Sequence, residues 1–143
     1  MRYWLLIINI ENWKISIKKG IYGVKELYLS KYQLIQKGDE FIFYIKGSML
    51  GGAFRVLKKF QSQKKYFHDD FYPYLLGIKA KVACTMPIEL KKEVITSLAF
   101  IKNKSNWGSH LMGKAIIELS KKDFAYLKSY ITQDGGANSN VNK

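Results

Sequence analysis

The sequence predicts an α+β fold in which a small, mainly antiparallel β-barrel is flanked by helices. Two apolar runs, "YWLLIINI" at Tyr3–Ile10 and "EFIFYIK" at Glu40–Lys46, have the length and composition of strands buried on both faces. The strand patterns come first along the chain, the helical patterns come mostly late, and the links are of hairpin type, which is typical of α+β proteins. Because several short strands are apolar on both faces, we expect the sheet to curl into a barrel.

The first fifty residues contain the predicted central strands. Asn9 is the one polar residue in the first strand, and a short irregular or helical piece follows that strand. Ser30 and Gln33 form a capping box, which predicts a short helical turn through Ile35. After a turn at 37–39 and the strand at 40–46, the glycine-rich stretch 47–52 is typical of a hairpin connection into a third strand at 53–60.

The second half of the chain begins with a polar and aromatic stretch at 61–72, which we expect to be a loop. From Tyr74 to Cys84 apolar residues alternate with lysines, as in a half-buried strand. Pro87 separates this strand from a predicted helix at 89–98. Ser120 and Asp123 form a second capping box, which predicts a helix ending near Ile131.

Length and composition predict one domain over residues 1–132, followed by a disordered tail over 133–143, where "QDGGANSNVNK" is poor in apolar residues. The apolar run before Glu11 is too short to cross a membrane and has no signal-peptide cleavage site. The single cysteine, Cys84, excludes a disulfide framework and fits a reducing compartment. We therefore expect a cytoplasmic protein that does not bind membranes.

The composition is strongly basic and rich in aromatic residues. Lys and Arg number 24 against 11 Asp and Glu, which gives a formal charge of +13, and aromatic residues make up 15% of the chain. A charge of this sign attracts polyanions, so nucleic acid is the expected partner. The alternative is a lysine-rich surface that serves only solvation.

Catalytic and metal-binding patterns are incomplete. His68 stands beside Asp69 and Asp70, but adjacent residues rarely point at one metal ion, and His110 is not spaced to help. The sequence has no G-x-S-x-G nucleophile motif, and 47–52 lacks the Lys-Ser/Thr of a phosphate-binding loop. We expect no enzyme, cofactor or metal. A hydrolytic or nucleotide-modifying enzyme that uses His110 or the run 68–70 is an alternative.

Three aromatic residues, Trp13, Tyr22 and Trp107, stand beside glycine, asparagine or lysine and not inside an apolar period. Each could be a core residue, but together they resemble the walls of a pocket for a planar base. If a helix begins near Trp107, the side chains of Trp107, His110 and Lys114 cluster on one side of it. That side lies about 100–150° from the centre of the apolar stripe of the helix. That face suits an anionic, flat ligand. The alternative is that Trp107 covers a helix end and His110 is solvated.

Several motifs together resemble the EVE domain family of the PUA-like superfamily: "RYWLLIINIENW", "GIYGV", "KGDEFIFYI", "YPY" before a strand, and "LAFIKNKSNWGSHLMGKAIIEL". The chain is most similar to the archaeal single-domain members of uncharacterised function, over about Arg2–Ile131. YTH domains resemble this family in fold and read methylated adenine through an aromatic cage. The resemblance implies a PUA-like barrel with a pocket for a modified base.

The resemblance also implies the residues of that pocket: Asn9, Trp13, Tyr22, Gly23, Val24, Lys102, Asn103, Trp107 and His110. Relatives often have Trp where this chain has Tyr22, which implies a weaker cage or one tuned to a different ring. We expect contacts to the nucleic-acid backbone from Lys46, Lys102, Lys104 and Lys114. The expected function is recognition of a modified, for example methylated, nucleobase in RNA or DNA. A sensor of small molecules or free nucleotides is the alternative.

Overall fold

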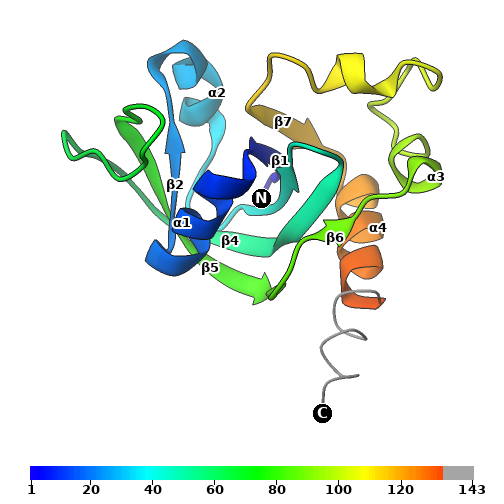
Figure 1. Ribbon diagram of the computed structural model, residues 1–143, viewed down its shortest axis with the longest axis horizontal. Helices are drawn as coiled ribbons and strands as arrows, with labels where there is room; N and C mark the ends of the chain where they lie inside the picture. Colours follow the sequence, from blue (N-terminus) through cyan, green and yellow to red (C-terminus); the bar gives the residue numbers. More distant parts are fainter. Residues whose placement is uncertain (134–143) are drawn as a thin grey trace.

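The computed structural model describes residues 1–133 (Figure 1). Most strands form one curled sheet in the order β2 (Ile21–Val24), β5 (Tyr74–Val82), β4 (Met49–Gln61), β3 (Glu40–Ile45), β1 (Tyr3–Ile8) and β7 (Ile116–Leu119). The short β6 (Ile88–Glu89) pairs with the start of β4. All these pairs are antiparallel except β1 with β3. The α+β prediction is confirmed, and the sheet is a half-barrel with β2 and β7 at its edges.

The central strands β1 and β3 are buried on both faces, as the sequence predicts. Leu5 and Ile42 point into a core on one side, where α4 (Lys121–Ile131) packs across β1, β3, β4 and β7. Trp4 and Phe43 point into a second core on the concave side, which is shared with residues of α1 (Ile10–Lys19) and α2 (Leu29–Leu34). The continuous apolar runs are therefore explained by two separate cores.

The first strand is two residues shorter than predicted because Asn9 caps the helix that follows. Its Oδ1 accepts a hydrogen bond of 2.8 Å from the Asn12 backbone N–H, and Gly20 ends α1 in the left-handed region at φ 68°. The segment after the strand, which was predicted to be short and either irregular or helical, is thus the regular helix α1. The capping box predicted at Ser30 is wrong: α2 begins after η1 (Glu26–Tyr28), its N-cap is Tyr28, and no side chain caps it.

The hairpin between β3 and β4 is tighter than predicted. The turn covers only 46–48, so β4 begins at Met49, inside the stretch expected to be a loop. Strand β5 is confirmed, but its alternation is incomplete. Ala80 is exposed, whereas Leu75 is buried in a small cluster with Ile21 and Phe67 under the loop 62–73.

The helices expected between 89 and 119 are mostly absent. Strand β6 and the four-residue α3 (Lys92–Ile95) replace the first, and η2 (Trp107–His110) is a single 3-10 turn. Pairing with β1 then makes 116–119 a strand. The last helix is confirmed, because Ser120 Oγ accepts a 3.0 Å hydrogen bond from the Asp123 backbone N–H at the start of α4.

The disordered tail expected over 133–143 lies, apart from Gln133, outside the described residues. Among the helices within residues 1–133, none combines the length and the apolar composition needed to cross a membrane.

Candidate functional site

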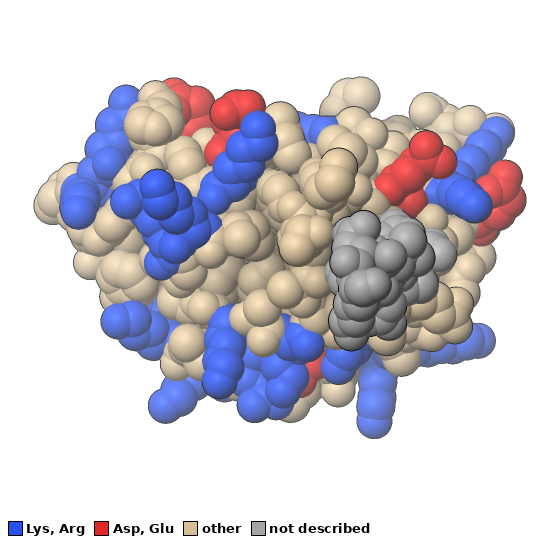
Figure 2. Space-filling view, turned by 60° about the horizontal axis from the view of Figure 1, so that its bottom comes forward, with Lys and Arg blue, Asp and Glu red and all other residues tan. Residues whose placement is uncertain are grey.

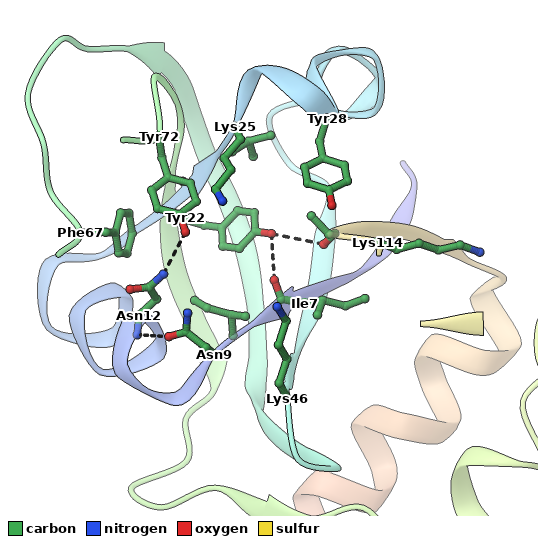
Figure 3. Close-up of a pocket in the computed structure, with 14 residues that line it drawn as sticks. Ile7, Asn9, Asn12, Tyr22, Lys25, Tyr28, Lys46, Phe67, Tyr72 and Lys114 are labelled. Atoms are coloured by element: carbon green, nitrogen blue, oxygen red, sulfur yellow. Dashed lines mark hydrogen bonds between the residues drawn. The ribbon is translucent and has the colours of Figure 1, made fainter. Parts of the chain in front are cut away.

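A cavity of about 120 Å³ lies where the two edges of the curled sheet approach each other (Figure 3). One wall comes from β2 and the residue after it, 22–25. The opposite wall comes from the end of β1, 7–9, and from 114–115 just before β7. Asn12 of α1, Tyr28, Lys46, and Phe67 and Tyr72 of the loop 62–73 complete the lining. The site is thus assembled from segments far apart in the sequence.

Tyr22 joins the two edges at the bottom of the cavity. Its hydroxyl lies 3.2 Å from the carbonyl oxygens of both Ile7 and Ala115, and the Ile7 N–H donates to the same Ala115 oxygen at 2.8 Å. Only 3% of Tyr22 is exposed, and this burial raises the pKa of its phenol. The hydroxyl therefore remains a proton donor that ties β2 to the far edge.

Gly23 allows the loop 62–73 to lie directly on β2. A Cβ at Gly23 would stand 2.6 Å from Cβ of Tyr72 and 2.8 Å from Cε2 of Phe67, too close for any side chain without a shift. The Gly23 backbone is also oriented by its pairing. The Ile78 N–H donates to the Gly20 oxygen, so alternate residues of β2 bond to β5 and the polar groups of Gly23 point to the free edge.

A hydrogen-bond network around Asp69 holds the loop 62–73 over the start of α1. The carboxylate accepts from Asn12 Nδ2 at 3.1 Å, from the Tyr72 hydroxyl at 2.9 Å and from Asn9 Nδ2 at 3.3 Å. Burial alone would raise the pKa of Asp69, but the hydrogen bonds from Asn12, Tyr72 and Asn9 hold it below its usual value. Burial, and then the bond to Asp69, raise the pKa of Tyr72. The network therefore keeps a carboxylate beside a protonated phenol.

Three lysines contribute to the mouth of the cavity. Lys25 and Lys46 direct their ammonium groups toward it, whereas Lys114 extends along the surface (Figure 3). Lys25 Nζ lies 2.9 Å from an oxygen of Asp70, and this hydrogen bond raises the pKa of Lys25. Within residues 1–133 no acidic partner is found for Lys46 or Lys114. These two cations remain available to an anion.

The structure brings part of the predicted site together. The cavity is lined by Asn9, Tyr22, Gly23, Val24, Lys46 and Lys114. Trp13 does not line it: the residue is 5% exposed, lies in the concave core, and donates its indole N–H to the Gly51 oxygen at 3.0 Å. Trp13 therefore occupies a core position in this structure.

The other predicted residues lie in the segment 101–110, outside the lining of the cavity. Trp107 is half-buried against the α4 core, and the Asn103 N–H donates to His110 Nε2 at 2.9 Å. Lys104 donates to the Leu98 oxygen at 3.2 Å, and Lys102 is exposed. The helical face on which Trp107 and His110 were placed does not form, because η2 is one turn long. A ligand contact by these residues remains a prediction.

Several lining residues were not expected from the sequence: Asn12, Lys25, Tyr28, Phe67 and Tyr72. Lys25 directly follows the "YGV" element, whose residues were predicted to line the pocket, so its position in the sequence could have indicated that it lies at the site. The polar stretch "KKYFHDDFYPY" is also dense in aromatic residues, which a solvated loop does not need. That density could have indicated that Phe67 and Tyr72 contribute to a site.

The half-barrel has the PUA-like fold of YTH domains. It superimposes on the YTH domain of Mmi1, solved in complex with RNA, with a TM-score of 0.67 and 15% identity, over 94% of this chain and 86% of that one. This likeness establishes the fold.

The chain belongs to the UPF0310 family. It is 32% identical over 142 residues to a UPF0310 protein of Pyrococcus abyssi, which covers 92% of this chain and all of the relative. A UPF0310 protein of Pyrococcus horikoshii is 27% identical over 92% of this chain and 99% of its own length. No family model matches the chain.

Proposed function

We propose that this protein is a non-catalytic module that binds RNA or DNA and takes one modified base, for example a methylated one, into the cavity. The observation that carries the proposal is an aromatic cavity at a free sheet edge with lysines at its mouth. At about 120 Å³ the cavity is far smaller than the roughly 300–1,000 Å³ of sites for drug-sized ligands. It therefore suits a single ring, with the rest of the ligand outside.

The lining offers the contacts by which proteins hold an extruded base, namely stacking on aromatic rings and hydrogen bonds to the base edge. Tyr72 and Phe67 supply rings, and the free backbone groups of Gly23 supply a donor and an acceptor. Lys46 is placed to meet a phosphate at the mouth. Among the charged side chains on the face in Figure 2, Lys and Arg cover more of the surface than Asp and Glu, which supports a polyanionic partner.

Two resemblances support the proposal. The motifs shared with the EVE domain family include "GIYGV", which forms the β2 wall, and "GKA", which supplies Lys114 and Ala115. The similar YTH structure contains RNA. We further propose that residues 1–132 form a single EVE domain and that the protein works in the cytoplasm.

The chemistry of the cavity favours binding over catalysis. General acids and bases work best with pKa values near the operating pH. Here burial raises the pKa of Tyr22 and of Tyr72, and the pKa of Asp69 is lowered, so each group moves away from neutrality. Within residues 1–133 no group of three or more His, Cys, Asp or Glu side chains is arranged so that it could hold a metal ion.

The proposal is tested with ten-nucleotide RNA and DNA strands that carry adenine or a methylated adenine at the centre. We expect tighter binding of one modified strand, measured by fluorescence anisotropy. Lys46→Ala should weaken binding and lower the salt slope by about 0.7 on single strands. The control is Lys81→Ala, an exposed lysine of β5 outside the lining. Equal losses in both variants would refute the cavity as the site.

The sensor alternative rests on the small volume of the cavity, which would also hold the ring of a free nucleotide. The same assay separates the two functions. A free methylated nucleoside monophosphate that binds as tightly as the ten-nucleotide strand would favour the sensor, because the strand then adds no contacts.

A further inference from the structure

Beside the cavity, the end of β4 and the loop 62–73 pair lysines with aromatic rings. Lys58 Nζ lies 5.1 Å from the centroid of the Phe60 ring, and Lys64 Nζ lies 5.0 Å from that of Tyr66. Lys65 adds a further exposed cation. We call Lys58, Phe60, Lys64, Lys65 and Tyr66 the 58–66 arm. The loop that carries most of it projects at the left edge of Figure 1.

The arm is held in place by packing below it. Phe60 and Tyr66 are half-buried against the small cluster that contains Phe67 and Leu75, so one side of each ring is anchored. The Lys58 stem lies across Gly77, where a Cβ would stand 2.9 Å from Lys58 Cγ. Within residues 1–133 no ion pair involves a lysine of the arm. Exposed cations and half-buried rings therefore lie together on this surface.

The loop 62–73 contributes residues both to the arm and to the lining of the cavity. Phe67 lines the cavity and belongs to the cluster on which the rings of the arm rest. The charge of Lys65 also acts on Asp70, which pairs with Lys25 at the mouth.

We infer that the 58–66 arm is a second nucleic-acid contact, which holds the single strand flanking the base in the cavity; the inference rests on the proposed function. Alternating rings and cations suit this occupant. Neighbouring bases would take the place of Lys58 and Lys64 over the rings of Phe60 and Tyr66, and the released lysines, with Lys65, would meet the phosphates. Such binding tolerates different sequences, because every base has a flat face. The cavity would then select the base, and the arm would supply affinity for the strand.

The test compares mixed-sequence strands of three and ten nucleotides, as RNA and as DNA, each with the same central methylated adenine. The arm variants are Lys58→Ala/Lys64→Ala and Tyr66→Leu, the latter keeping apolar contact with the cluster while removing the flat ring. The charge-matched control is Lys81→Ala/Lys92→Ala, two exposed lysines outside the arm and the cavity lining. Melting curves check that each variant is folded.

We expect both arm variants to bind the ten-nucleotide strand about fivefold or more weakly and the three-nucleotide strand normally. Tyr66→Leu loses one stacked base, and the double lysine variant loses phosphate contacts. The double lysine variant should also lower the salt slope by about 1.4, that is, two phosphate contacts on a single strand. Losses for RNA alone, for DNA alone or for both support the arm and identify its strand.

Losses no greater than in the control would overturn the arm. Tighter binding of an acidic peptide than of the ten-nucleotide strand, abolished by the double lysine variant, would also overturn it. Lys46→Ala keeps the two proposals apart. Suppose that Lys46→Ala binds strands of both lengths normally, while the arm variants bind the ten-nucleotide strand more weakly. The cavity is then refuted as the base site, and the arm is still supported as a contact to the strand.

Discussion

Replacement of Gly23 with alanine should disturb the contact between β2 and the loop 62–73. The new Cβ would stand 2.6 Å from Cβ of Tyr72 and 2.8 Å from Cε2 of Phe67. The protein can respond in two ways. The loop can remain in place under compression, or it can lift away from β2, and the cheaper response sets the loss of stability.

Compression of a packed contact costs about 1–3 kcal/mol. A lifted loop would lose the bonds from Asn9 and Asn12 to the Asp69 carboxylate, at about 1.5–3 kcal/mol each because the acceptor is charged. It would also expose Phe67, which is 2% exposed, at a further cost of about 1.5–3 kcal/mol. Compression is therefore cheaper, and the expected loss is about 1–3 kcal/mol. For a chain of this size that lowers the Tm by about 2–12 °C.

Thermal unfolding followed by circular dichroism measures this change. Gly108→Ala is the matched control, because a Cβ there meets no atom within 4 Å and its φ is not positive. We expect the control to be neutral or up to about 1 kcal/mol more stable, since alanine restricts the unfolded chain. If Gly23→Ala has the same Tm as Gly108→Ala, the close packing of the loop 62–73 against β2 is refuted.

Two further predictions concern the core and the response to acid. Trp13→Ala should lower the free energy of unfolding by about 3–5 kcal/mol, because it empties a buried site; a loss under about 1 kcal/mol in urea would contradict the core position. Asp69→Asn should flatten the dependence of stability on pH in acid. The pKa of Asp69 is lowered by folding, so its carboxylate stabilises the protein above the unfolded value of 3.8, and this contribution is lost as pH falls through the lowered pKa. Urea unfolding from pH 6 to pH 2.5 measures the difference, and parallel curves for both proteins would refute it.

The sequence predicts those elements whose signal is local. The strands at 3–8 and 40–45 are continuous apolar runs, and the cap at Ser120 consists of two residues three positions apart. The helix expected from Trp107 fails for the converse reason. Its angular argument needs a regular helix, whereas strand pairing with β1 decides the conformation of 116–119. A tertiary contact thus overrides the local pattern.

In the candidate site, too, residues with a local sequence signal could be predicted and residues placed by tertiary contacts could not. Asn9, Tyr22 and Gly23 are implied by motifs at the ends of β1 and in β2, and these motifs do line the cavity. Phe67 and Tyr72 could not be assigned, because their place depends on how the loop 62–73 folds back onto β2. That return depends on a missing side chain at Gly23, more than forty positions earlier in the chain.

The position of β1 between β3 and β7 has a consequence for how the protein is made. The first strand completes its pairing only with one of the last, as in the pair Leu6 and Ile116. During synthesis β1 must therefore wait for nearly the whole chain, with one row of backbone groups unpaired, and such exposed edges recruit other chains. Contacts this distant in sequence also slow folding. Because Ala115 closes the cavity, the binding site is expected to form late in folding, and chains that stall before residue 116 would be prone to aggregate.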